Sequence, residues 1–381
     1  MNKIFEKGGK LYFLHSTVDA FETFLKVPGT VSLKGAHVRD SIDLKRIMII
    51  AVISVIPAAL FGMWNVGYQH ALAVQGPGAP LDIWGNFWFG FLKVLPLYII
   101  AYGVGLAIEF ASAQIRGEEV NEGYLMSGML IPLIVPVDVP LWMLAVAVAF
   151  AVLFGKEVFG GTGMNIWNPA LLTRAFLFFS YPDHMSGSGS WIALRKGETL
   201  LDGATGATPL SFVGDGMDAL TQAGTQYGTS FWDMFVGTVP GSVGETSVIA
   251  ILLGAILLLW TGVASWKIMV SCVAGALAVG FLGNVCGATD VPAVTQLVMG
   301  GFAFGAVFMA TDPVTSAQTE CGKWIYGFLI GAICIIVRLF NPGYAEGMML
   351  AILLGNTFAP LIDWVVVNRH TARKAKKVRI A

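Results

Sequence analysis

Charged residues are scarce in this sequence. They make up 12% of its 381 residues, whereas about a quarter of the residues in a typical soluble domain are charged. Apolar residues make up 56%, and the mean hydropathy is +0.72. This balance excludes an ordinary soluble globular domain, and the net charge of -1 argues against nucleic acid as a partner. The length allows many spans of about 20 residues each and one sizeable soluble excursion.

Cysteine is also scarce, and its spacing excludes the common local metal motifs. The four cysteines form no CxxC pair; they are Cys272, Cys286, Cys321 and Cys334. We interpret them as small apolar residues in helices. The alternative is a single cysteine that contributes to a metal cluster shared with another chain.

The sequence contains long runs of apolar residues with few charges. They predict an all-α integral membrane protein with about ten transmembrane helices. The predicted spans are 47–65, 85–110, 124–137, 139–158, 167–181, 246–262, 268–285, 293–310, 324–340 and 344–365.

Lys and Arg are missing from some connections and concentrated at the two ends. The first 46 residues carry eight of them, and six more follow Asn368 with no acid. The 66–84 connection has none, and residues 182–245 have two against seven acids. The positive-inside rule therefore places both ends in the cytoplasm and 182–245 outside, in agreement with an even number of spans.

These boundaries divide the chain into five parts. The predicted parts are a cytoplasmic N-terminal arm (1–46), a first five-helix repeat (47–181), an extracytoplasmic loop (182–245), a second five-helix repeat (246–365) and a basic cytoplasmic tail (366–381). A repeated Asn-Pro dipeptide weakly suggests inverted repeats. Asn168-Pro169 is expected to open the fifth span and Asn341-Pro342 the tenth. Such repeats predict broken helices and a binding region near the bilayer midplane.

Six charged residues stand in or beside the apolar runs. A charge within a span costs roughly 2.5–3.5 kcal/mol on insertion scales, so it usually marks a site or a paired network. Two readings are open for Lys156 and Arg174, which either snorkel to the interface or pair internally. The six residues are Glu109, Lys156, Glu157, Arg174, Glu346 and Asp363.

Three polar, small-residue stretches are candidate binding loops. Residues 160–169 and 310–316 fall on the same predicted membrane face, where their hydroxyls, amides and backbone N–H groups suit a polar ring or an ion. Plain helix turns would also explain them. The run of small residues in 202–210, on the outer side, lets the backbone approach a bulky group closely. Thr208 supplies a hydroxyl there for ester formation, although a flexible loop is the simpler interpretation.

The outer stretch resembles the D-x-x-S/T-G-A-S/T signal at which a flavin transferase attaches FMN through a phosphoester. With this signal in place, the whole chain resembles the family of the B subunit of the Na+-translocating NADH:quinone reductase of bacterial inner membranes. The segments that carry the resemblance are His37–Ser41, Asp43–Arg46, Glu119–Gly123, Lys156–Gly163, Asn168–Ala170, Asp202–Thr208, Pro240–Ser242, Gly244–Glu245, Ala310–Pro313 and Glu346–Ala351.

The resemblance implies a fold of ten helices in two inverted repeats, similar to urea channels. It implies a redox pump of six subunits in which electrons from NADH reach quinone while Na+ moves outward. The present chain would hold covalent FMN and non-covalent riboflavin. NADH would bind elsewhere in the complex, because no Gly-rich strand–turn–helix pattern occurs here.

The resemblance also assigns roles to individual residues. Thr208 is the expected FMN attachment residue, within a signal that includes Asp202, Thr205, Gly206 and Ala207. Gly105 matches a glycine associated with quinone, although the family's glycine pair reads Gly105-Leu106 here. Glu109 and Asp363 match acids linked to Na+ passage. Our own assignment, from location alone, gives riboflavin to Asn165, Asn168 and Asp312.

Two other functions are open. The D subunit of the Rnf complex is homologous and also carries threonine-linked FMN, but it serves ferredoxin:NAD chemistry. A non-redox channel of the urea-channel type would have no need for the 202–208 signal.

Overall fold

The computed structural model describes residues 44–380 except 77–80, 118–122, 186–190, 196, 202–205, 224–227 and 342–345, together with residues 18, 34 and 35. The N-terminal arm therefore lies almost wholly outside the described residues, as do Asp202 and Thr205. The described part is helical and contains no strand.

Six helices in the described part are long and apolar enough to cross a membrane. Their length follows from unbroken apolar sequence, since about 20 residues at 1.5 Å each match the hydrocarbon thickness. The six are α2 (Leu44–Gln75), α3 (Ile83–Arg116), α5 (Leu141–Gly155) with the short η2 (Glu157–Phe159), α11 (Trp266–Val285), α14 (Glu320–Phe340) and α15 (Met348–Ile380).

The other apolar runs form shorter or broken helices. The short ones are α4 (Tyr124–Ile134), α6 (Pro169–Ser180) and α10 (Val248–Trp260). The predicted 293–310 span is divided into α12 (Ala293–Val298), α13 (Phe302–Phe304) and the π-helical η4 (Gly305–Met309). Every predicted run thus coincides with helix, and the expected broken helix is present.

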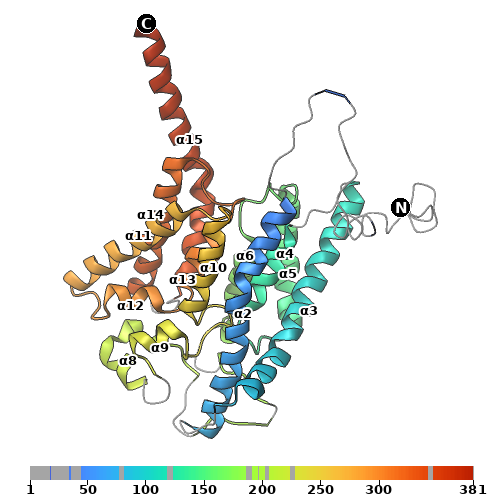
Figure 1. The fold of residues 1–381 in the computed structure, drawn as a ribbon, viewed down its shortest axis with the longest axis vertical. Helices are drawn as coiled ribbons and strands as arrows, with labels where there is room; N and C mark the ends of the chain where they lie inside the picture. Colours follow the sequence, from blue (N-terminus) through green and yellow to red (C-terminus); the bar gives the residue numbers. More distant parts are fainter. Residues whose placement is uncertain are drawn as a thin grey trace.

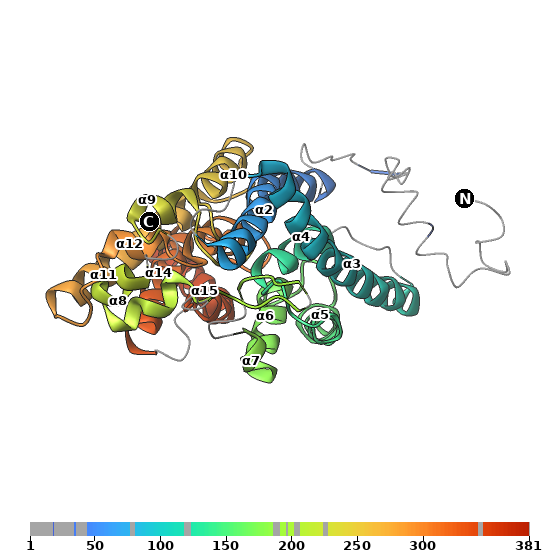
Figure 2. The same cartoon turned by 90° about the horizontal axis from the view of Figure 1, so that it is seen from below.

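The two halves of the chain lie side by side (Figures 1 and 2). In the first half α2 packs on α3, α3 on α5, and α5 on α6. In the second half α11 packs on α14, and α14 on α15, while α2 and α10 join the halves. The outer face of α3 leaves Trp84, Trp88 and Leu92 exposed, which suits a lipid-facing surface.

The start of α2 and the basic end of α15 lie at one end of the molecule, and the described parts of the 191–247 connection lie at the other (Figure 1). That connection joins the last turns of α2, where Leu201 N donates to the Ala73 carbonyl at 3.1 Å. Asn65 Nδ2 likewise donates to the Val239 carbonyl at 2.9 Å. The predicted outer loop and the 66–84 connection therefore share one end.

The outer connection is folded in its described part. It contains α7 (Pro182–Met185), the 3-10 helix η3 (Pro209–Asp215), α8 (Met217–Ala223) and α9 (Phe231–Val236). Leu210, Val213 and Met234 form an apolar cluster with Val298 and Met299, so the connection packs on α12.

One sequence expectation about the repeats is wrong. Asn168 does open α6, where its side-chain oxygen accepts from Ala170 N at 2.9 Å and Pro169 follows. Asn341, however, is the residue after the last turn of α14, and α15 begins only at Met348. Asn341 therefore follows the end of a helix and does not open the tenth span, while Pro342 lies outside the described residues.

Candidate functional site

Thr208 lies at a pocket where the outer connection meets the helices. It precedes η3, which begins at Pro209, and its side chain is half-buried. Its hydroxyl makes no hydrogen bond with any described residue, while its carbonyl accepts from Ser211. The pocket holds about 40 Å³. Its lining includes Trp191, Thr208, Leu210, Met234, Glu245, Thr246, Gly300 and Glu346.

The inner wall of this pocket carries buried charge. Arg174, from α6, lies 2.6 Å from Glu245 Oε1 and 3.7 Å from Glu346 Oε2. Arg174 is 4% exposed and Glu245 7%, so this is an internal ion cluster. The snorkelling interpretation of Arg174 is therefore wrong.

The ion cluster surrounds the break between α12 and α13. Arg338 donates to the carbonyls of Gln296 (2.5 Å) and Met299 (3.0 Å), which have no helical partner at the end of α12. Glu346 accepts from Gly301 N at 2.9 Å, at the start of α13. Cations at a helix C-terminus and anions at an N-terminus both oppose the helix dipole favourably. The four charged side chains therefore stabilise an interrupted helix inside the protein.

Two glycines make this arrangement possible. Gly300 has a φ of +57°, a conformation that glycine adopts readily. A Cβ atom at Gly301 would lie 2.5 Å from Glu245 Oε1 and 2.6 Å from Glu346 Oε1. Glycine is therefore required for both carboxylates to reach the broken helix.

A second pocket, of about 70 Å³, lies at the opposite end of α10. The structure brings Asn165, Asn168 and Asp312 together in it, from the two connections that the sequence suggested would share a site. Apolar side chains form most of the remaining wall, including Met48, Leu130, Leu258 and Phe308. Such a mixture of apolar walls and few polar groups is typical of small-molecule sites.

Asn165, Asn168 and Asp312 differ in their free hydrogen-bonding groups; the other polar residues that line this pocket are Ser127, Lys156, Thr162 and Thr311. Asn168 Nδ2 donates to Asp312 Oδ2 at 3.1 Å, and its oxygen opens α6. Asp312 also accepts from Val314 N and Thr315 Oγ1. Asn165 Nδ2 donates to the Trp167 carbonyl, but its Oδ1 has no partner among the described residues. Asn168 and Asp312 therefore hold the loops together, and Asn165 keeps an acceptor for a ligand.

Glu109 and Lys156 form a buried ion pair at the wall of this pocket, which Lys156 lines. Both side chains are about 5% exposed or less, and Lys156 Nζ donates to Glu109 Oε1. Glu109 Oε2 is buried and has no hydrogen-bond partner among the described residues. Glu157 pairs instead with Arg116 at 3.2 Å, as expected for a residue adjacent to Lys156 that cannot face it. The snorkelling interpretation of Lys156 is also wrong.

Gly105 lies in close contact with a buried aromatic ring. A Cβ atom there would overlap the ring and hydroxyl of Tyr124. Tyr124 is fully buried, and its hydroxyl donates to the Ala101 carbonyl at 2.8 Å. In this structure, the lack of a side chain at Gly105 allows the Tyr124 ring to pack against α3.

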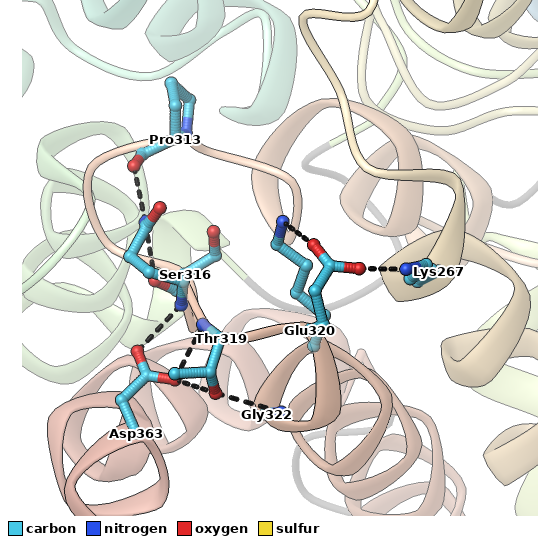
Figure 3. A network of polar contacts seen from close by, with 9 residues as sticks. Lys267, Pro313, Ser316, Thr319, Glu320, Gly322 and Asp363 are labelled. Atoms are coloured by element: carbon cyan, nitrogen blue, oxygen red, sulfur yellow. Dashed lines mark hydrogen bonds and ion pairs between the residues drawn. The ribbon is translucent and has the colours of Figure 1, made fainter. Parts of the chain in front are cut away.

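Asp363 holds the start of α14 (Figure 3). It accepts from Gln318 N (2.7 Å), Thr319 N (3.0 Å) and Thr319 Oγ1 (2.6 Å). Thr319 in turn accepts from Gly322 N at 3.1 Å. The two predicted ion-path acids, Asp363 and Glu109, thus contact different partners on different helices.

Two charged residues of the ion cluster, Arg338 and Glu245, were not predicted from the sequence as site residues. Arg338 is a lone arginine near the end of a predicted span, and that position was the available signal. Glu245 directly precedes an apolar run and gave no comparable signal. In the part of the chain that the structure describes, no group of three or more His, Cys, Asp or Glu side chains could hold a metal ion.

The helices and the two pockets define a multi-pass helical membrane protein. The chain belongs to the NQR2, RnfD, RnfE family, whose sequence model matches residues 31–372. It is 44% identical over 397 residues to the B subunit of the Na(+)-translocating NADH-quinone reductase of Chromohalobacter salexigens, covering 98% of this chain and 94% of that relative. The B subunits of the same name from Ectopseudomonas mendocina and Azotobacter vinelandii are each 43% identical, covering 97% of this chain and 96% of each relative.

Proposed function

We propose that this chain is the B subunit of a redox-driven sodium pump that passes electrons from NADH to quinone. The proposal is supported by the named relatives, which match nearly the full length of the chain. It assigns the protein to a multi-subunit complex in the bacterial inner membrane, with quinone and Na+ as substrates. The Rnf D subunit is the alternative within the family, and the other subunits that co-purify with the chain would distinguish the two.

The proposed topology has ten spans in two inverted five-helix repeats with both ends cytoplasmic. In each half the second helix packs on the fourth and the fourth on the fifth. The third helix is short or interrupted in both halves, as α4 and as α12 to η4, although α6 and α10 are short as well. The first helices, α2 and α10, meet between the halves. These repeated pairings support the inverted-repeat arrangement.

The single observation that carries the redox assignment is the free Thr208 hydroxyl at its pocket. A hydroxyl that makes no hydrogen bond within the chain is available for a phosphoester, and the Thr208 hydroxyl makes none with any described residue. Gly206 and Ala207, the small residues before it, are buried. We propose FMN attachment at Thr208, with a maturation step by a flavin transferase that reads Asp202 to Thr208.

The protein's part in the chemistry is to position groups and provide electrostatic stabilisation, while a bound flavin would supply the electron transfer. We propose riboflavin in the pocket of Asn165, Asn168 and Asp312, where Asn165 Oδ1 offers the free acceptor. We propose quinone near Gly105, on the helix that also carries Glu109. For Na+, the unpartnered Glu109 Oε2 supports a role in the ion path, and Asp363 is the second proposed acid.

In-gel flavin fluorescence after denaturation tests the proposed function. The wild-type chain, made in cells that contain the flavin transferase, should give a fluorescent band. Thr208→Ala should lose it, and Thr208→Ser should keep it because the hydroxyl remains. Thr221→Ala is the matched control, since Thr221 is an exposed threonine of the same outer connection. A wild-type chain without covalent flavin would contradict the redox assignment and favour a channel.

A further inference from the structure

A groove of about 520 Å³ lies between α14 and α15, away from both pockets described above. Its apolar part includes Ile325 of α14 with Leu361 and Val365 of α15. Ile325 is 46% exposed and Leu361 53%. Its other part is basic and is formed by Arg369, His370 and Arg373.

The apolar and basic residues form one continuous stripe along α15. Leu361, Val365, Arg369 and Arg373 follow each other at intervals of four, so they share a face of the helix. A ligand that fits this stripe must be apolar over the first two positions and anionic over the last two. Among the described residues that line the groove, none is acidic.

Asp363 of α15 and Glu320 of α14, the two helices of the groove, have other partners. Asp363 accepts from Gln318 and Thr319, and Glu320 pairs with Lys267 and Lys323 (Figure 3). Among the described residues, Arg369, His370 and Arg373 have no acidic partner. The positive charge of the groove is therefore not neutralised within the described chain.

The position of the basic residues along α15 matches the boundary of a bilayer. From Met348 to Arg369 the helix rises about 31 Å, close to the thickness of the hydrocarbon core. Trp364 is 63% exposed just before this level, as expected of a residue at the membrane interface. Beyond it, α15 projects past the other helices (Figure 1).

We propose that this groove binds an anionic phospholipid, with its acyl chains on Ile325, Leu361 and Val365 and its phosphate on Arg369 and Arg373. Basic pockets between helices on the cytoplasmic side suit such headgroups. The assignment is independent of the flavin chemistry, because it uses none of the residues of the two pockets.

Cys321 provides a reporter, because it is exposed and lines the groove. The assembled complex is placed in phosphatidylcholine vesicles with or without phosphatidylglycerol. Alkylation of Cys321 by N-ethylmaleimide is then followed by peptide mass spectrometry, with the exposed Cys286 as an internal reference. Phosphatidylglycerol should slow alkylation of Cys321 several-fold relative to Cys286.

Charge variants identify the site within the groove. Each Arg near a membrane surface is worth about 1 kcal/mol, so phosphatidylglycerol affinity should fall about fivefold in Arg373→Gln and about thirtyfold in Arg369→Gln/Arg373→Gln. Lys45→Gln removes one cation from the start of α2, which does not line the groove, and should leave protection unchanged. The surface potential of the vesicle acts on all variants alike, so the comparison isolates the groove.

Two outcomes would overturn the proposal. Equal alkylation of Cys321 with and without phosphatidylglycerol would mean that no anionic lipid occupies the groove. Protection that persists in lipid-free detergent would mean that another protein of the complex covers it. Loss of flavin fluorescence in Thr208→Ala bears on neither outcome.

Discussion

Glu245 shows how strongly a single residue depends on its surroundings in this protein. It lies in the connection before α10, and it is buried beside Arg174 and Glu346. Burial raises the pKa of Glu245 from 4.5 to about 7; the charge of Glu346 adds to this effect and Arg174 opposes it. The folded protein therefore favours the protonated form more than the unfolded chain does.

A raised acid pKa makes stability fall as pH rises. The contribution of protonated Glu245 is fully present below about pH 4.5 and is lost as pH rises through about 7. Glu245→Gln copies the neutral form, so its melting temperature should change less than that of wild type between about pH 5.5 and about pH 8. The expected difference is a flatter dependence of melting temperature on pH in Glu245→Gln than in wild type.

Size-exclusion chromatography of a fluorescently tagged chain after heating would measure this difference. Asp218→Asn, an exposed acid of α8, is the control and should retain the wild-type profile. If Glu245→Gln also kept that profile, another group would be responsible for the pH dependence.

At the scale of elements, the ends and breaks of helices carry most of the polar contacts. Arg338 and Glu346 stabilise the two sides of the break in the α12–α13 segment. Asp363 of α15 stabilises the start of α14, so one helix supplies the cap of its neighbour. Helix ends leave backbone groups without partners, and a membrane interior offers no water to replace them.

Asp363→Ala should lower the stability of the assembled protein by about 1–2 kcal/mol, because three donors at the start of α14 lose their acceptor. Asp363→Asn retains one acceptor oxygen and should be affected less. Melting of the purified complex distinguishes the two variants. An unchanged melting temperature in Asp363→Ala would show that these contacts do not hold the helix.

The same pair of variants separates the capping role from a role in the ion path. If the negative charge of Asp363 serves Na+ passage, Asp363→Asn should lose Na+-dependent quinone reduction as fully as Asp363→Ala, although it remains better folded. If capping is its main role, activity should follow stability.

At the scale of the whole molecule, the sequence predicted elements better than contacts. Apolar runs located the helices, because a membrane requires long apolar segments. The pairing of Arg174 with Glu245, 71 positions apart, is a product of tertiary packing that a single sequence does not reveal. A shared site for Asn165, Asn168 and Asp312 was predicted only from the membrane face on which their connections lie. The roles proposed for Gly105, Glu109 and Thr208 came from the family resemblance.

The natural cysteines test the proposed topology. Cys286 and Cys321 are exposed and lie near opposite ends of the helices, whereas Cys272 and Cys334 are fully buried. A membrane-impermeant maleimide added to intact cells should label Cys286 and spare Cys321. Inside-out vesicles should reverse the pattern, and the buried pair should remain unlabelled in both. Labelling of Cys321 from outside would contradict the ten-span arrangement.

The shortness of α10 has a consequence for the membrane voltage. Thr246, just before this helix, lines the Thr208 pocket, and Leu258, near its end, lines the other. The helical residues from Val248 to Leu258 advance only about 15 Å, half the thickness of the hydrocarbon core. If solvent enters both pockets, the electric field between them would be about twice as strong as across intact lipid. Moving one elementary charge across 100 mV changes its energy by about 2.3 kcal/mol. A charge that moves between the pockets would thus cross most of the voltage in half the distance.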